Sequence, residues 1–289
     1  MTAGPTDARR RGQTGDVLTV DPSRLVFVGG LHRSGTTPLA RALAEHPDVS
    51  GLSATDVKED EGQHLQSVYP QAKVYGGPGR FALDARSHLT EASALASPGT
   101  AERLVEAWAP YWDLDRRLLV EKSPPNLVMG RFLQAVFPGS AMIVVLRHPV
   151  IVALSTVKWR KLLSRNFQNF TSLDTMLAHW VAAHRTFLQD SPRIERLVVL
   201  RYEDLVSDPT RVLQPVQDLL GLDTPVPISS LRPSHSGTYE ATWASMATSP
   251  LRRRQRAALV ERYSEVVADF GYDMNDVHAL GPLALPATG

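Results

Sequence analysis

The sequence predicts an α/β fold, in which a central parallel sheet is flanked by helices on both faces. Short continuous apolar runs, typical of strands buried on both faces, recur along the chain. Helical patterns separate these runs, which favours parallel strands joined by crossover helices. The 289 residues are 43% hydrophobic and 21% charged, enough to form a sizeable core. We therefore expect a single domain over residues 24–289.

The strands and helices follow from these patterns in chain order. A first strand over residues 24–30 ends in glycines, and a helix over 37–45 is stopped by His46-Pro47. Further apolar runs predict strands at 118–120, 141–146 and 197–200, and helical patterns cover 173–188 and about 250–270.

Three segments lack such patterns. Residues 1–23 contain consecutive arginines with no apolar run after them, so we expect a disordered tail and no secretory signal. Residues 51–98 are polar and predict an excursion from the sheet, with short helices, that shapes a substrate site. Residues 224–239 are rich in proline and predict a second irregular stretch.

Composition excludes several classes of function. The formal net charge of +1 gives no whole-molecule reason to expect nucleic acid or an anionic membrane, so any anion site must be local. The absence of cysteine excludes disulfides, thiolate metal sites and cysteine nucleophiles. The sequence has no run of 18 apolar residues, so it predicts no transmembrane helix. We expect a cytoplasmic protein without membrane insertion.

The stretch LVFVGGLHRSGTT, residues 25–37, is almost a nucleotide-binding phosphate loop. Gly30, Gly35 and Thr37 match the pattern G-x-x-x-x-G-K-[ST], but Thr36 occupies the position of the lysine. Backbone amides at the start of a helix bind anions whichever side chain stands at position 36, so we expect this loop to bind an anion. A strand, such a loop and a helix together predict a P-loop-like sheet. The missing cation argues against ordinary ATP or GTP hydrolysis. The alternative is a plain turn between strand and helix.

A second candidate for anion binding lies at residues 142–161. The expected strand ends at Arg147, and Ser155 follows eight residues later, in a helix that Pro149 is suited to open. An arginine at the carboxyl end of a parallel strand faces the crevice where ligands bind, and with a hydroxyl it can hold a phosphate. The alternative is a surface ion pair.

Together, RSGTT and LRHP with its following serine resemble the sulfotransferase family that uses 3′-phosphoadenosine 5′-phosphosulfate (PAPS). The resemblance covers most of residues 24–222, including EKSPPN and LRYEDLVSDP, and is closer to the tyrosylprotein and heparan enzymes than to the cytosolic ones. It implies transfer of a sulfuryl group, without a metal, to a hydroxyl on a small molecule, glycan or lipid. The implied donor-binding residues are Arg33, Ser34, Gly35, Thr36, Thr37, Arg147, Ser155 and Tyr202.

The resemblance assigns two of these stretches more closely. Lys122 would lie beside the oxygen that bridges phosphate and sulfate, with Arg33 as a second cation of the catalytic site. The alternative for Lys122 is an ion pair with a neighbour such as Glu121. Tyr202 would contact adenine, or else close the core as an aromatic residue. Residues 232–239 would close over the nucleotide, and the basic run 251–256 is expected to be a solvated helix face.

The general base is the weakest part of the resemblance. Cytosolic sulfotransferases have a histidine where this chain has Pro124, whereas other members use an acid after the first helix. Residues 56–64 supply Glu59 and Glu61 as first candidates and His64 behind them. Positions two apart on a helix lie about 200° apart, so we expect one glutamate to face inward and the other water. The alternative is a solvated acidic turn.

Two other functions remain open from the sequence. One is a kinase or other nucleoside-triphosphate enzyme, which Thr36 disfavours, and the other is a nucleotide-binding module without a base. His179 and His184, five apart on the expected helix 173–188, are predicted to be packing residues because they do not share a face. The sequence predicts neither the acceptor nor the oligomeric state.

Overall fold

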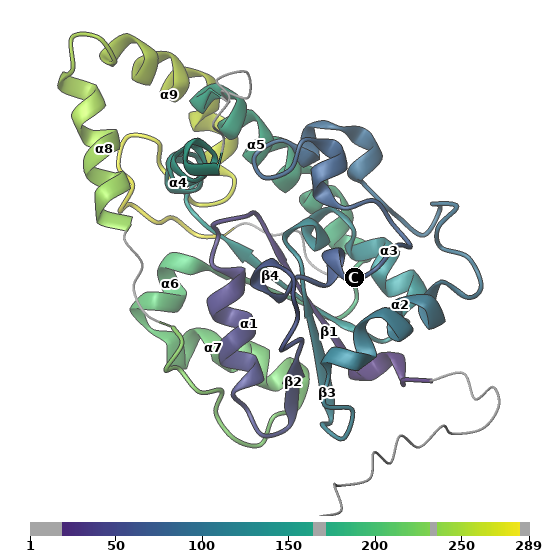
Figure 1. Ribbon diagram of the computed structural model, residues 1–289. Helices are drawn as coiled ribbons and strands as arrows, with labels where there is room; N and C mark the ends of the chain where they lie inside the picture. The colour runs from purple at the N-terminus through teal and green to yellow at the C-terminus, as the bar shows by residue number, and fades with distance from the viewer. Residues whose placement is uncertain (1–18, 164–171, 232–235, 284–289) are drawn as a thin grey trace, which may run out of the picture.

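The computed structural model describes residues 19–163, 172–231 and 236–283. Five parallel strands form one sheet in the order β2-β3-β1-β4-β5 (Figure 1). The strands are β1 (Leu25–Gly30), β2 (Val49–Gly51), β3 (Leu118–Lys122), β4 (Ala141–Leu146) and β5 (Leu197–Arg201). The predicted parallel sheet is confirmed, although the sequence had not indicated the short edge strand β2.

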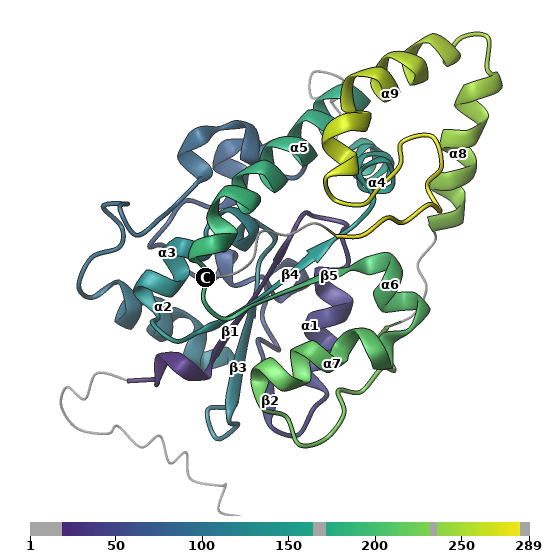
Figure 2. The same cartoon turned by 180° about the vertical axis from the view of Figure 1, so that it is seen from behind.

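Helices cover both faces of the sheet, as predicted. They are α1 (Thr36–Ala44), α2 (Thr100–Trp108), α3 (Gly130–Val136), α4 (Pro149–Leu163), α5 (Leu173–Asp190), α6 (Tyr202–Ser207), α7 (Pro209–Leu220), α8 (Ser236–Thr248) and α9 (Arg253–Ala268). Figure 2 shows α1, α6 and α7 on one side of the sheet and α2, α3 and α5 on the other. Among the described helices, none has both the length and the apolar character needed to cross a membrane.

Alternation along β1 builds a separate core on each face. Leu25 and Phe27 join the cluster beneath α2, α3 and α5, where the Phe27 ring meets Trp108 at a centroid distance of 6.2 Å. Val26 and Val28 join the opposite cluster with residues of α1 and α7. Because both faces of the strand are buried, its sequence is continuously apolar.

Several element boundaries differ from the prediction. The first helix begins at Thr36, β3 extends to Lys122, so that this lysine is the last residue of the strand and does not follow it, and β5 extends to Arg201. The predicted N-terminal tail falls largely outside the described residues, but Pro22–Arg24 already forms a 3-10 turn. The excursion over 51–98 is present as a chain of short 3-10 turns and bends.

The prediction of an irregular stretch over 224–239 is wrong at its end. Residues 232–235 lie outside the described residues, and α8 begins at Ser236. This helix packs against α4 and α9 and buries only Trp243 and Met246. Two buried apolar residues are too few to produce a helical hydrophobic repeat in the sequence, so the formation of this helix depends on tertiary packing.

Candidate active site

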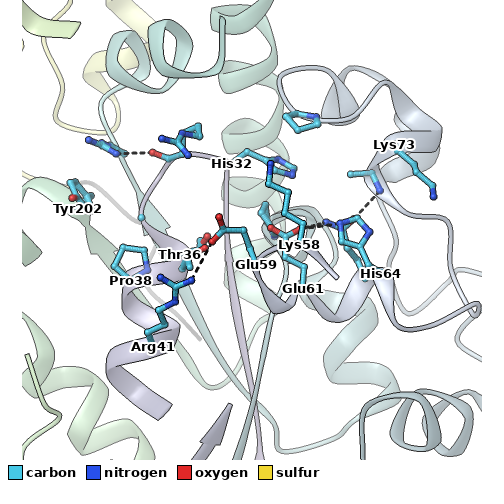
Figure 3. Close-up of a pocket in the computed structure, with 18 residues that line it drawn as sticks. His32, Thr36, Pro38, Arg41, Lys58, Glu59, Glu61, His64, Lys73 and Tyr202 are labelled. Carbon is cyan, nitrogen blue, oxygen red and sulfur yellow. Dashed lines mark hydrogen bonds and ion pairs between the residues drawn. The ribbon is translucent and has the colours of Figure 1, made fainter. Parts of the chain in front are cut away.

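The carboxyl ends of the strands open on a cavity of about 400 Å³ (Figure 3). The loop after β1 and the start of α1 line one side, with Tyr202 and Pro38 (Figure 3). The excursion lines the other side with Lys58, Glu61, His64 and other residues. This is the edge at which parallel α/β sheets bind ligands, so the cavity is the candidate active site.

The loop after β1 leaves the first turn of α1 uncapped. Gly35 is the N-cap residue, with φ 103°, and no side chain caps the helix. The N–H groups of a first helical turn lack intrahelical acceptors, and Gly35, Thr36 and Thr37 all border the cavity. A Cβ on Gly35 would lie 2.2 Å from the Tyr202 ring, so no larger residue fits. The predicted anion cradle is therefore sterically open to the cavity.

The two predicted anion-binding stretches meet directly. Arg33 Nε donates to Ser155 Oγ at 2.9 Å, and Arg147 Nη1 donates to the carbonyl of Arg33 at 2.8 Å. Arg147 Nη2 also donates to Ser236 Oγ at 2.6 Å, from the first residue of α8. Arg147 is buried, which does not fit the alternative of an ion pair at the surface. These contacts join the segments that follow β1 and β4 to the helices α4 and α8.

Burial shapes the chemistry of Arg147 and Tyr202. Arg147 is 6% exposed, and this burial lowers the pKa of its guanidinium below the usual value. The guanidinium carbon lies 4.1 Å from the centre of the Tyr202 ring, which is itself buried against Gly35. Tyr202 therefore packs against the loop and Arg147, and it also borders the cavity.

Lys122 lies at the end of β3 beneath the excursion. It is 4% exposed, and Nζ donates to the carbonyl of Glu59 at 2.7 Å and to Oε1 of Glu61 at 3.4 Å. Lys122 therefore forms an ion pair, as in the alternative, but its partner is Glu61 and not Glu121. Lys122 borders a smaller neighbouring cavity of about 50 Å³.

Glu121 points into the protein on the other side of β3. It accepts hydrogen bonds from Ser123 Oγ and Asn126 Nδ2, both at 2.6 Å. Burial raises the pKa of Glu121 to about 7. These two hydrogen bonds connect the buried carboxyl to Ser123 and Asn126, and they hold the chain that follows β3.

The two candidate glutamates separate as expected, but for another reason. Both border the cavity, but Glu61 is 6% exposed, whereas Glu59 is exposed and its Oε2 lies 3.8 Å from Arg41 Nη2. The segment is not an α-helix, so the expected helical geometry is wrong. Glu59 and Asp60 adopt left-handed backbone conformations, with φ 56° and 49°, and these turn Glu61 inward.

His64 lies beside Glu61 in the following 3-10 turn. Its Nδ1 is 3.0 Å from Gln71 Oε1, and its Nε2 is 3.5 Å from Glu61 Oε2. All three predicted acid–base candidates therefore border one cavity, together with Arg33. Ser34, Ser155 and Lys122 lie behind its surface; the Oγ of Ser34 has no partner in the described part of the chain.

Sequence reasoning missed two residues that the structure brings to the site. His32 lines the cavity, and burial lowers its pKa to about 4, so the imidazole is neutral at pH 7. Gln63 donates to the Glu61 carboxylate. The signal for His32 was its position inside the phosphate loop. Gln63 had no comparable signal in the sequence.

Residues predicted to lie outside the site do so. The buried His179 ring meets Phe81 at 4.7 Å, and His184 stacks on Trp180 at 3.8 Å, as expected of packing residues. The basic run 251–256 is exposed over most of its length at the start of α9.

Comparison with known proteins identifies the family. The model of the sulfotransferase family matches residues 25–225, which include every site residue described above except Ser236. The chain belongs to the sulfotransferase family. Two curated relatives, from Mycobacterium bovis and Mycobacterium tuberculosis, are named omega-hydroxy-beta-dihydromenaquinone-9 sulfotransferase Stf3. Each is 30% identical over 185 residues, which cover 60% of this chain and 46% of the relative.

This sulfotransferase chain therefore aligns with about half the length of those relatives. Among solved structures, the sulfotransferase STF9 from Mycobacterium avium matches with a TM-score of 0.51 at 17% identity. That match covers 92% of this chain and 80% of STF9, and it supports a shared fold.

Proposed function

We propose that this protein transfers a sulfuryl group from PAPS to a hydroxyl acceptor. One observation carries the proposal: the uncapped start of α1 and the Arg147–Ser155 pair meet through Arg33, beside Lys122 and Glu61. Two anion sites joined in this way suit a nucleotide with phosphates at both its 5′ and 3′ positions. The family supplies the chemistry that such a nucleotide serves.

The proposed donor site divides into two parts. The open N–H groups at Gly35, Thr36 and Thr37 bind the 5′-phosphosulfate, with charge supplied by Arg33. Arg147 and Ser155 bind the 3′-phosphate, for which a guanidinium and a hydroxyl are suitable donors. Tyr202 supports both parts, because its ring packs on Gly35 and on Arg147.

The proposed reaction is a direct in-line transfer. The acceptor oxygen forms a bond to sulfur while the bond from sulfur to the bridging phosphate oxygen breaks, which releases 3′,5′-adenosine bisphosphate. Lys122 stabilises the charge that develops on the leaving oxygen. Glu61 takes the acceptor proton, since it is the buried one of the two glutamates that border the cavity. His64 is the second candidate for this step, and no metal is required by the proposal.

For the acceptor, we propose a hydroxyl on a lipid-type molecule. Away from the phosphate loop, the cavity is lined by the apolar groups of Ala72, Pro78 and Pro124, together with polar side chains that include Lys58, His64 and Lys73. The curated relatives are named for a hydroxylated menaquinone, whose reacting group is a hydroxyl on an apolar chain. The apolar part of the lining and the name of the relatives support a lipid acceptor.

The test is nucleotide binding followed by turnover. In calorimetry, 3′,5′-adenosine bisphosphate should bind, whereas ATP with Mg²⁺ should bind weakly or not at all. Labelled PAPS should then yield sulfated product with at least one member of a panel of hydroxylated quinones, alcohols, phenols and sugars. Preference for ATP with Mg²⁺ would favour the kinase-type alternative, and bisphosphate binding without any transfer would favour the non-catalytic module.

A further inference from the structure

Gln63 connects three segments around the proposed base. Its side chain is 1% exposed, and Nε2 donates to Glu61 Oε2 at 2.6 Å. At the other end of the amide, Oε1 accepts from the N–H of Ala72 at 2.9 Å. The backbone N–H of Gln63 donates to Ser123 Oγ at 2.9 Å. Both ends of the side chain and the backbone are thus held in place.

Hydrogen bonds connect Gln63 to strand β3 of the sheet. Ser123 Oγ donates to Glu121, which also accepts from Asn126. On the preceding residue, the carbonyl of Gly62 accepts from Trp108 Nε1 at 3.0 Å. Buried hydrogen bonds at both ends of a side chain restrict it to one arrangement, so the amide of Gln63 presents its donor at a defined point.

The two oxygens of Glu61 have different partners. Oε1 faces Lys122 at 3.4 Å, whereas Oε2 faces Gln63 at 2.6 Å and His64 at 3.5 Å. The bond to Gln63 is the shorter one, and it does not involve Lys122. A carboxylate oxygen has two lone pairs, so Glu61 still has room to accept a proton.

We propose that Gln63 is a positioning residue, which holds the Glu61 carboxylate toward the acceptor. This inference rests on the proposed function and deepens it. Gln63 does not touch the reacting atoms, and it acts through Glu61 alone. The donor site around Arg33 and Arg147 makes no contact with Gln63 in the described hydrogen bonds, so donor affinity is independent of it.

Two variants separate the two ends of the Gln63 amide. Gln63→Met removes both hydrogen bonds at similar size. Gln63→Glu keeps an acceptor for the Ala72 N–H but replaces the donor to Glu61 with a second carboxylate, so that the two acids share a proton. We expect both variants to lower kcat by roughly tenfold to a hundredfold, as loss of a hydrogen bond to a charged group implies. Bisphosphate affinity and the KM for PAPS should stay unchanged.

The matched control is Gln66→Met. Gln66 is a buried glutamine in the same segment, hydrogen-bonded to Val68, Tyr69 and the carbonyl of Gln63, and it does not contact Glu61. Its loss should lower the thermal midpoint about as much as Gln63→Met does, while kcat changes by less than about threefold. A kcat loss equal to that of Gln63→Met would show that the segment, and not the contact with Glu61, is responsible.

A double-mutant cycle completes the test. In a Glu61→Gln background, Gln63→Met should cause no further fall in kcat, because the positioned group is already lost. A full additional fall would overturn the proposal, as would normal turnover of Gln63→Glu or of Glu61→Gln. Failure of the proposed function itself is distinguishable, since the unmodified protein would then show no bisphosphate binding or no transfer.

Discussion

The contact between Arg147 and Arg33 leads to a prediction about which phosphate Arg147 binds. Arg147→Ala removes a buried guanidinium that lies between the phosphate loop and α8. A hydrogen bond to a charged group contributes about 1.5 to 3 kcal/mol, which corresponds to roughly a tenfold to 150-fold weaker Kd. We expect a loss of this size for 3′,5′-adenosine bisphosphate.

The same substitution also removes the donor to the Arg33 carbonyl, so some loss is expected for any nucleotide that uses the loop. The measurement is therefore a ratio. Isothermal calorimetry should compare the bisphosphate with adenosine 5′-phosphate, and Arg147→Ala should reduce the preference for the bisphosphate at least tenfold, as the charged bond implies. Ser155→Ala should reduce it less, because a neutral hydroxyl is a weaker partner.

Two further variants make this test specific. Arg147→Lys retains a charge but loses the planar fork, and it should recover part of the preference. Arg254→Ala removes an exposed arginine of α9 and should leave both affinities unchanged. Equal weakening of the two nucleotides by Arg147→Ala would refute the assignment and leave Arg147 as a support for the loop.

Three other outcomes follow from the site. Lys122→Ala should lower kcat about a hundredfold with little change in bisphosphate affinity, because its contact strengthens as charge develops; an unchanged kcat at saturating PAPS would return Lys122 to a structural role. Glu61→Gln should lower kcat on the order of 10² to 10⁴, whereas Glu59→Gln should stay near the parent value, and the reverse order in steady-state assays would move the base to Glu59. Burial raises the pKa of Glu121 from 4.5 to about 7, so the folded state favours its protonated form. Its stabilising contribution is complete below pH 4.5 and is lost as the pH rises to about 7, a decline of about 3 kcal/mol in the free energy of unfolding. Urea unfolding at pH 4.5 and pH 8 should show this decline relative to Glu121→Gln, and parallel curves for the two proteins would contradict it.

The sequence alone determined those parts of the protein that depend on neighbouring residues. Continuous apolar runs fixed β1 and β4, because a strand buried on both faces has no polar side to display. The anion cradle was also predictable, since Gly35 and the residues after it form a turn and an uncapped helix without help from distant segments. The split between Glu59 and Glu61 was predicted too, although the helical reason given for it was wrong.

Tertiary structure decided which of these parts meet. Arg33 and Arg147 are far apart in the chain, and they touch because β1 and β4 are adjacent parallel strands whose carboxyl ends share one edge. Lys122 reaches Glu61 because β3 lies on the other side of β1 and the excursion folds back over it. The left-handed turn at Glu59 and Asp60, the contact of Gln63 with Glu61 and the helix α8 left no periodic pattern in the sequence. Hydrophobic periodicity reports only which side of a segment is buried, whereas these features depend on hydrogen bonds and packing partners supplied by residues distant in the chain.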